Sequence, residues 1–479
     1  MADTVASSAS VNRLKSPVTL PCGRVVPNRF AKAPMEELQA PFGGGLPPTR
    51  LLNLYKEWAE GGWGMIITGN IAIDQTHLGT PFDVTFSKSV SSADMDRYKE
   101  YAKSCQAGKA PSTSNQHTRP LAIVQLVHAG RQSGRGFGRY PWKASMAPSA
   151  VPMATAAGSL PWPLSSAFDW LMWGSCRAMT TAEVEDLVKR FADAAEVVHD
   201  AGFDGVELHG SHGYMLAAFL SPRTNLRTDK YGGSARNRFR IVEEIIVEIR
   251  RRLPKAFVVG IKLNSADYVH GGLTEEDALL NVQWLAEMGG VDFVEISGGN
   301  YENPSFLTSD FNADDEMAKL SETTSHQSVK PTPPVKASTK KREAFFSNFA
   351  RRAAAALPAP TADSPHRMAL ILTGGLRSRT GCLRALEDAE VDMCGIGRAS
   401  ALLPDLPRSF TDESVSEEEA IVPAPDMALH PPGLLKLVPL KLVGAGWTTL
   451  YHAAQMGRIV KGLKADPNIG GWSLLKGLV

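Results

Sequence analysis

Two histidines and a tyrosine lie within six residues of one another in the segment ELHGSHGYM. His209, His212 and Tyr214 bring two imidazoles and a phenol to one place, where they can bind a small polar group and move a proton. Paired histidines also bind metals, but no carboxylate or third histidine at a recognisable spacing completes a metal site. Purely structural hydrogen bonding is the remaining alternative. The segment therefore predicts a catalytic site with no metal.

Two polar side chains interrupt apolar runs that otherwise have the composition of buried strands. Lys262 lies in VVGIKLN, and Gln125 lies in AIVQLVH. A buried ammonium group requires an anionic partner or a strongly shifted pKa, which favours a functional role for Lys262. A buried amide such as Gln125 can bond to an amide-like ring edge. A polar core residue without a function is the alternative in both cases.

Glycine-rich loops follow three of the later apolar runs, in ISGG, TGGL and GIGR. These loops contain Gly298, Gly299, Gly374, Gly375, Gly395, Gly397 and Arg398. Glycine lets backbone N–H groups approach an anion closely, and an arginine side chain can pair with it. Loops favour glycine for other reasons, so the glycines alone are weak evidence. Their position after the last strands predicts a phosphate site, because β/α barrels commonly bind phosphate there.

The elements that must position these residues alternate between helices and apolar strands. In the middle of the chain, Thr180 or Thr181 can cap a helix that ends at Gly202, and the strand FDGVELHG follows. The same unit recurs with a helix that stops before Pro254, and again with a helix that Thr274 opens. Strand candidates lie near residues 30, 65, 121, 203, 257, 291, 368 and 392.

Eight strands that alternate with helices predict an α/β fold of the TIM (β/α)8 barrel class. In such barrels the active residues lie at the carboxyl ends of the strands, which is where His209 and His212 stand. A doubly wound open sheet is the alternative, but no GxGxxG motif follows the first strand. We therefore expect one large barrel with loop insertions.

Two long segments depart from this alternation. Residues 310–342 are rich in Ser, Thr, Lys and Pro, and they predict a flexible insertion or a mobile lid. Beyond the barrel, which is predicted to span residues 17–405, an acidic linker leads into a helical segment. This C-terminal extension, residues 406–479, is expected to pack against the barrel, with membrane-surface contact as the alternative. The segment PWPLSSAFDWLMWG is expected either to line an apolar pocket or to form a surface hairpin.

Charge and cysteine content exclude several classes of protein. The 51 Lys and Arg residues balance 50 Asp and Glu residues to a net charge of +1, which argues against nucleic acid as a partner. The five cysteines lie far apart without a CxxC pair, so neither a disulfide framework nor an iron–sulfur site is expected. The sequence contains no signal-peptide core and no uninterrupted membrane segment. We expect a cytoplasmic protein whose partners are small molecules.

Together, these motifs resemble the old yellow enzyme family of FMN-dependent oxidoreductases, in its fungal type. The similarity extends from about Pro17 to Asp405, and its most specific part is FDGVELHGSHGYMLAAFLSPRTNLRTDKYGGSARNRFR. NRFAKAPM, IVQLVHAGRQ, IKLNSADY, ISGG, TGGLRSR and GIGR also occur in the order of the family. The resemblance implies a barrel that binds FMN across its carboxyl end. It implies that the cofactor contacts Ala33, Pro34, Met35, Glu36, Gly69, Gln125, Lys262, Gly298, Gly375, Gly397 and Arg398.

The resemblance also implies a ping-pong reaction. NADH or NADPH passes a hydride to FMN, which passes it to the β-carbon of an α,β-unsaturated carbonyl compound such as an enone or a quinone. His209 and His212 correspond to the pair that holds the carbonyl oxygen, and Tyr214 corresponds to the proton donor to Cα. By analogy, such an ene-reductase belongs to specialised metabolism. The alternatives are a redox-silent flavin-bound barrel acting as an isomerase or cyclase, and an inactive interaction protein.

Two residues depart from the pattern of the family. Lys262 stands where arginine is common, which keeps a charge that offsets negative charge on the reduced flavin but loses the planar guanidinium. Glu36 stands where many members carry Thr, Ser or Cys after the Met. An ionised carboxylate there disfavours the anionic reduced flavin, so Glu36 is expected to be protonated or to point away. We hypothesise that Glu36 lowers the flavin potential.

Overall fold

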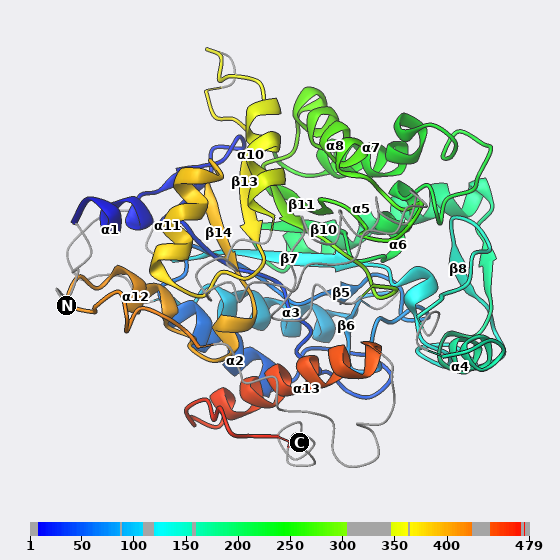
Figure 1. Cartoon of the computed structure of the whole chain (residues 1–479), viewed down its shortest axis with the longest axis horizontal. Coiled ribbons are helices and arrows are strands. Elements are labelled where there is room, and N and C mark those ends of the chain that lie inside the picture. The colour runs from blue at the N-terminus through cyan, green and yellow to red at the C-terminus, as the bar shows by residue number, and fades with distance from the viewer. Residues whose placement is uncertain are drawn as a thin grey trace, which may run out of the picture.

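Eight parallel strands close into a barrel at the centre of the molecule (Figure 1). The computed structural model describes residues 8–86, 89–108, 119–155, 160–303, 346–362, 365–423, 441–470 and 474. In barrel order the strands are β3 (Phe30–Lys32), β4 (Met65–Ile67), β7 (Leu121–Val127), β10 (Gly205–Gly210), β11 (Val258–Asn264), β12 (Phe293–Ser297), β13 (Ala369–Thr373) and β14 (Met393–Ile396). Each strand pairs in parallel with the next, and β14 pairs with β3 to close the ring. All eight lie at the predicted positions, which confirms the TIM-barrel fold.

Helices cover the outside of the barrel and connect its strands (Figure 1). They are α2 (Thr49–Glu60), α3 (Ser92–Cys105), α5 (Thr181–Asp200), α7 (Ala235–Arg252), α8 (Glu275–Met288), α10 (Ser347–Ala356) and α11 (Arg379–Asp388). Two predicted helix starts are confirmed. The Thr180 hydroxyl accepts the Glu183 N–H at 3.2 Å, and the Glu183 carboxylate accepts the Thr180 N–H at 2.8 Å. Thr274 caps α8 in the same position.

Short elements lie at both ends of the barrel. At the amino-terminal end, α1 (Ser8–Lys15) precedes an antiparallel hairpin of β1 (Val18–Thr19) and β2 (Val25–Val26). Two small pairs, β5 (Ile71–Ala72) with β6 (Val84–Thr85) and β8 (Ser145–Ala147) with β9 (Cys176–Ala178), lie in the loops. The remaining elements are η1 (Gly130–Gln132), α4 (Leu164–Trp173), α6 (Met215–Leu220), η4 (Arg398–Ala401) and α12 (Leu406–Thr411).

The interior of the barrel changes from apolar to polar along the strands. At the amino-terminal end, Val18, Leu20 and Val26 of the β1–β2 hairpin pack with apolar side chains from the barrel strands. In this layer the Phe293 ring fills the space in front of Gly260, where an added Cβ would come within 2.2 Å of it. The polar side chains that meet across the strands nearer their carboxyl ends are Gln125, Glu207, Lys262, Glu295 and Thr373. A layer of polar side chains therefore lies inside the barrel near the carboxyl ends of the strands.

The C-terminal extension contributes a helix that lies along one side of the barrel. This helix, α13 (Lys441–Val460), packs against α2 and η4, and it lies near α2 at the lower edge of Figure 1. Packing against the barrel is the arrangement expected from the sequence. The predicted insertion at residues 310–342 lies outside the described residues. Across the part of the chain that the structure describes, no helix combines the length and hydrophobicity required to cross a membrane.

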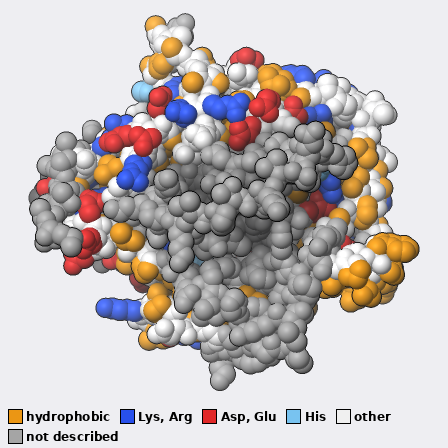
Figure 2. All heavy atoms as spheres, viewed as in Figure 1, with side chains coloured by type: hydrophobic (Ala, Val, Ile, Leu, Met, Phe, Trp, Pro, Cys, Tyr) orange, Lys and Arg blue, Asp and Glu red, His pale blue; other side chains and the backbone are white. Residues whose placement is uncertain are grey.

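Residues Leu164–Trp173 of the segment PWPLSSAFDWLMWG form the helix α4 and not a hairpin, and none of them lines the pocket at the carboxyl ends of the barrel strands. Trp170 and Leu171 are exposed, and Figure 2 shows hydrophobic side chains gathered over α4 at the lower right. The inward face is polar instead, because the Asp169 carboxylate accepts the Thr155 N–H at 3.0 Å. The helix therefore presents an apolar surface outward, away from the strand ends.

Candidate active site

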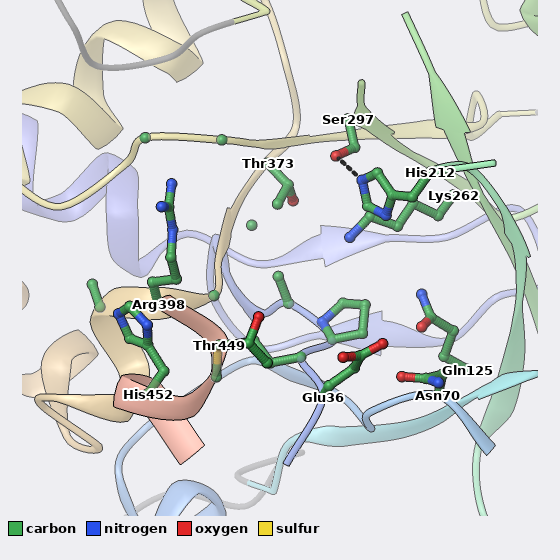
Figure 3. Close-up of a pocket in the computed structure, with 18 of the residues that line it drawn as sticks. Glu36, Asn70, Gln125, His212, Lys262, Ser297, Thr373, Arg398, Thr449 and His452 are labelled. Atoms are coloured by element: carbon green, nitrogen blue, oxygen red, sulfur yellow. Dashed lines mark hydrogen bonds between the residues drawn. The ribbon is translucent and has the colours of Figure 1, made fainter. Parts of the chain in front are cut away.

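A cavity of about 210 Å³ lies at the carboxyl ends of the barrel strands (Figure 3). Figure 3 shows polar side chains on two sides of it. One side carries Gln125, His212 and Lys262 from β7, β10 and β11 or the loops that follow them, and we call it the strand end. The other side carries Arg398 and His452 from η4 and α13, and we call it the loop end. The predicted residues that line the cavity are Ala33, Pro34, Met35, Glu36, Gln125, His209, His212, Tyr214, Lys262, Gly375, Gly397 and Arg398.

Two residues expected to contact the cofactor, Gly69 and Gly298, lie beside the cavity and not in its lining. The Gly69 N–H donates to the buried Glu37 carboxylate at 3.0 Å. At Gly298 an added Cβ would come within 2.8 Å of an aromatic ring, so this position requires glycine for packing. Their neighbours Asn70 and Ser297 line the cavity in their place.

A buried hydrogen-bond network supports the strand end. The Gln125 amide donates to Glu207 at 2.7 Å, the Lys262 ammonium pairs with Glu295 at 2.9 Å, and the Thr373 hydroxyl donates to Glu295 at 2.6 Å. Strand register sets these pairs, because Gln125 stands opposite Glu207 and Lys262 stands opposite Glu295. Burial and the Glu295 charge raise the pKa of Glu207. Burial opposes ionisation of Glu295 as well, but Lys262 holds the pKa of Glu295 below its ordinary value. Glu295 is thus the anionic partner that a buried lysine requires.

The two histidines are held as neutral rings with their centres 5.3 Å apart. The Ser211 N–H donates to Nδ1 of His209 at 3.4 Å, which leaves the hydrogen of His209 on Nε2. The His212 ring bonds through Nε2 to the Ser297 hydroxyl at 2.9 Å, and the backbone N–H of His212 donates to the Asn264 side-chain oxygen at 3.0 Å. Burial and nearby positive charge lower the pKa of both histidines well below the ordinary value. Each ring can therefore donate a hydrogen bond without carrying a charge.

Tyr214 belongs to a cluster of acidic groups at the edge of the strand end. Its ring centre lies 4.6 Å from that of His209, and its hydroxyl donates to the Glu36 carboxyl group at 2.8 Å. The Tyr301 hydroxyl lies 3.2 Å from both the Tyr214 hydroxyl and Glu36. Burial raises the pKa of Glu36, and burial together with Glu36 raises the pKa of Asp83 to about 7. From the sequence, Glu36 is expected to be protonated or to point away. In the structure its carboxyl group faces two phenol groups, and the pKa of Glu36 is raised.

The loop end combines glycines with cations from separate elements. Gly375 and Arg377 follow β13, Gly397 and Arg398 follow β14, and His452 comes from α13. Burial, followed by the nearby Arg377, lowers the pKa of Arg398 to about 10. Two guanidinium groups that repel each other in a buried site favour an anion between them. The predicted phosphate site is therefore also the most cationic part of the cavity lining.

Several lining residues carry no signal that sets them apart in the sequence. Asn70, Ser297 and Tyr301 stand within two residues of glycines that the motif analysis does single out. Motifs extended by two residues at the carboxyl end of each strand would include these three residues. The lining residues from α13 are Thr448, Thr449, His452 and Met456. Helical periodicity alone cannot place them at the cavity, because it does not say where a helix docks.

Among the residues that the structure describes, one group has ligand atoms close enough together to hold a metal ion: Asp74, His77 and His128. The Arg190 guanidinium pairs with Asp74 at 3.0 Å, and the two imidazole rings stack with their centres 4.8 Å apart. None of these residues lines the cavity. The carboxylate already has a cationic partner, which gives the group a structural explanation.

Comparison with known proteins identifies the family. Residues 16–302 match the NADH:flavin oxidoreductase / NADH oxidase family. The chain belongs to this family. It is 34% identical over 412 residues to the NADH-dependent flavin oxidoreductase iliE of Hypocrea jecorina, covering 85% of this chain and 92% of that protein. It is 36% identical over 402 residues to iccE of Talaromyces variabilis, covering 83% and 86%. A further relative, iliE of Neonectria sp., is 34% identical over 397 residues, and the chain spans 46% of its length.

Solved structures share the fold at lower identity. A 2-naphthoyl-CoA reductase complex has a TM-score of 0.67 at 21% identity, covering 92% of this chain and 59% of that one. Morphinone reductase has a TM-score of 0.60 at 21% identity, covering 86% and 91%. The old yellow enzyme homologue from Zymomonas mobilis has a TM-score of 0.60 at 20% identity, covering 86% and 94%. The family match confirms the resemblance to old yellow enzymes and FMN as the cofactor.

The residues present in the cavity fit FMN. Nδ2 of Asn70 is buried in the lining and, within the described chain, has no hydrogen-bond partner. Such an amide, together with Gln125, suits the amide-like edge of an isoalloxazine ring. Ala33 and Pro34 provide an apolar surface between the two ends, and the cations of the loop end suit a phosphate. The flavin ring and the phosphate thus each meet groups of the matching chemistry.

Proposed function

We propose that this protein uses NADH to reduce the C=C bond of an α,β-unsaturated carbonyl compound. The observation that carries the proposal is the cluster of His209, His212 and Tyr214 beside a buried carboxyl group, in the cavity that fits FMN. Two neutral hydrogen-bond donors and one proton donor are what this reduction requires. The names of the fungal relatives favour NADH over NADPH. By analogy with such enzymes, the reaction belongs to specialised metabolism.

The ring and the phosphate of FMN each have suitable groups for binding in the cavity. The amides of Gln125 and Asn70 and the ammonium of Lys262 suit the polar edge of the flavin ring. Gly397 and Arg398 suit the phosphate. The chemistry that FMN supplies when bound is a two-electron relay, in which a hydride taken from NADH reaches a substrate carbon.

The two histidines orient the substrate and stabilise its charge. Nε2–H of His209 and the ring of His212 donate hydrogen bonds to the carbonyl oxygen. Negative charge develops on that oxygen as Cβ receives the hydride, and donors fixed before the reaction stabilise it. The Ser211 and Ser297 contacts hold the rings in place for this task. Removal of one such donor typically slows a reaction by roughly 100- to 1000-fold.

Tyr214 supplies the proton and Glu36 replaces it. The Tyr214 hydroxyl gives its proton to Cα, and the protonated Glu36 carboxyl group gives a proton to the phenol oxygen 2.8 Å away. Burial and Glu36 raise the pKa of Tyr214 well above its ordinary value, so a lasting tyrosinate is costly. Solvent then returns a proton to Glu36. NADH, one proton and the substrate thus become NAD⁺ and a product with two more hydrogen atoms.

Replacement of Tyr214 with Phe tests this role. Under anaerobic conditions, the reoxidation of reduced flavin by an enone should slow by roughly 100-fold, the typical contribution of a general acid. Reduction of the flavin by NADH should keep its rate, because that step needs no proton from Tyr214. Tyr301→Phe is the matched control, since it removes a hydroxyl group 3.2 Å from the same carboxyl group. Equal slowing of both half-reactions in Tyr214→Phe would contradict the assignment.

The mass of the product separates reduction from the alternatives. Reduction adds two hydrogen atoms and consumes one NADH for each product formed. An isomerase or cyclase that uses the same residues gives a product of unchanged mass and consumes no NADH. A purified protein that binds no flavin would contradict both activities and would favour an inactive interaction protein.

A further inference from the structure

The loop end contains a histidine that the family assignment does not explain. His452 lies on α13 in the C-terminal extension, beyond Asp405, where the resemblance to the family ends. The residue is 4% exposed and its side chain lines the cavity. Figure 3 shows His452 on the same side of the cavity as Arg398, although the two come from different elements. A residue from the C-terminal extension thus lies on the same side of the cavity as the predicted phosphate site.

The hydrogen bonds of His452 define which nitrogen is available. Nδ1 lies 2.8 Å from the carbonyl oxygen of Thr448, which can only accept, so Nδ1 carries the hydrogen and donates it. Nε2 is then the bare nitrogen of a neutral ring. It is buried, and the described residues provide no hydrogen-bond partner for it. Buried polar atoms are rarely left in this state, which points to a ligand that the site is built to hold.

Two guanidinium groups act on the His452 ring. Burial, followed by the Arg398 charge, lowers the pKa of His452 to about 3, and Arg377 acts in the same direction. The neighbouring ring of Tyr451 on the same helix lies with its centre 5.1 Å away. The helix α2, which packs against α13, also carries ionisable side chains besides its tyrosine, namely Arg50, Lys56, Glu57 and Glu60. None of them lines the cavity. An anion in this position would offset the guanidinium charges and favour a hydrogen on Nε2.

We propose that His452 binds the phosphate group of FMN through Nε2, so that the C-terminal extension completes the cofactor site. In the bound state one proton lies between Nε2 and a phosphate oxygen, as an imidazolium beside a phosphate dianion. Hydrogen bonds between ionised partners of this kind are among the strong ones in proteins. The inference rests on FMN as the cofactor, and it assigns His452 to the phosphate and not to the flavin ring.

A comparison of FMN with riboflavin, which lacks the phosphate, tests the assignment. Affinities are measured by fluorescence titration of the full-length protein freed of flavin, in wild type and His452→Phe. The variant keeps a planar ring and loses both nitrogens. FMN binding should weaken roughly tenfold or more, the usual effect of losing a hydrogen bond between charged groups, and riboflavin binding should be unchanged. Equal weakening of both flavins, or no weakening of FMN binding, would overturn the proposal.

Tyr451→Phe is the matched control for this variant. It removes one buried polar atom from the adjacent residue of α13, outside the cavity lining. The affinities for both flavins should stay at the wild-type level. A selective loss of FMN binding in this control as large as that in His452→Phe would mean that disturbance of the helix, and not the imidazole, accounts for the effect.

The proposed contact is also measurable without a variant. At pH 8 the free His452 ring is neutral and most free FMN is a phosphate dianion, whose protonation has a pKa of about 6. Formation of the pair then takes up about one proton from solution. Calorimetric titration in buffers of different ionisation enthalpy should show that FMN binding takes up about one proton more than riboflavin binding. Equal uptake for the two flavins would overturn the proposal, whether or not His452→Phe folds.

Two outcomes distinguish a failure of this inference from a failure of the FMN assignment on which it rests. If the wild-type protein binds neither flavin, the FMN assignment itself fails. If His452→Phe raises the KM for NADH and leaves FMN affinity unchanged, the phosphate that His452 contacts belongs to the dinucleotide, and the present proposal is wrong while the cofactor assignment stands.

Discussion

The two ends of the cavity differ in the charged groups that act on their cationic side chains. At the strand end, Lys262 pairs with Glu295 at 2.9 Å within a buried network. At the loop end, Arg377 lowers the pKa of Arg398, and the His452 ring lies close to both guanidinium groups. A balanced network holds its geometry before any ligand arrives, whereas a concentration of like charge gains stability when an anion binds. We therefore expect the strand end to fix the position of reacting groups and the loop end to retain the cofactor.

Removal of the buried cation at the strand end should have the largest effect. Lys262→Met leaves the Glu295 carboxylate buried without its cation, and the free energy of unfolding should fall by about 3–5 kcal/mol. Chemical denaturation of the flavin-free protein measures this loss. The double variant Lys262→Met with Glu295→Gln should recover much of the stability, because it buries no unpaired charge. A single variant as stable as the wild type would show that the pair does not support the strand end.

Arg398→Ala tests the opposite expectation at the loop end. The variant should weaken FMN binding by about 1.5–3 kcal/mol and leave riboflavin binding unchanged. Stability of the flavin-free protein should not fall as it does in Lys262→Met, because the substitution relieves repulsion from Arg377. Gln125→Ala, by comparison, should weaken the binding of FMN and of riboflavin to the same extent. Loss of riboflavin binding in Arg398→Ala would remove the distinction between the two ends.

The pH dependence of flavin reoxidation tests the acidic cluster beside the strand end. Burial raises the pKa of Glu36, so the carboxyl group keeps its proton to a higher pH than an ordinary glutamic acid. As the pH rises through this raised pKa, the proton behind Tyr214 is lost, and reoxidation by an enone should slow several-fold. Glu36→Gln keeps the size of the side chain and cannot ionise, so this decline should disappear from the stopped-flow profile. An identical decline in the variant would assign it to another group.

The smallest expected effect concerns the midpoint potential of the flavin. If Glu36 lowers the potential, Glu36→Thr should raise it. Burial raises the pKa of Glu36 and so increases the neutral fraction of its carboxyl group at any given pH, and the shift near pH 7 should therefore be about 30 mV or less, equivalent to about 1.4 kcal/mol for a two-electron couple. The shift should grow as the pH rises and the carboxyl group ionises. Potentials that coincide for variant and wild type at both neutral and alkaline pH would refute the hypothesis.

Prediction from the sequence succeeds where local patterns determine the structure. The eight strands follow from apolar runs of strand length, and the start of α5 follows from the capping box of Thr180 and Glu183. The strand end is predictable for the same reason, since His209 and Lys262 interrupt such runs. Their partner Glu295 is harder to foresee. It stands in the equally apolar VDFVEISGG, and only the register between β11 and β12 brings it to Lys262.

Tertiary packing determines what the sequence does not reveal. The apolar periodicity of residues 441–460 indicates a helix, but the contacts with α2 and η4 decide that His452 reaches the cavity. In α4, the apolar side chains Trp170 and Leu171 remain exposed because Asp169 turns inward to bond Thr155. In both cases a contact made outside the helix carries information that the apolar pattern of the helix does not contain.

The position of α13 also sets an order of events during synthesis. The ribosome makes all eight barrel strands before it makes α13, so the barrel can begin to fold while the loop end still lacks this helix. If His452 binds the phosphate, the affinity for FMN reaches its full value only after the helix has docked. By thermodynamic reciprocity, bound FMN then holds the helix against the barrel. Acquisition of the cofactor would thus mark the last stage of maturation of the folded chain.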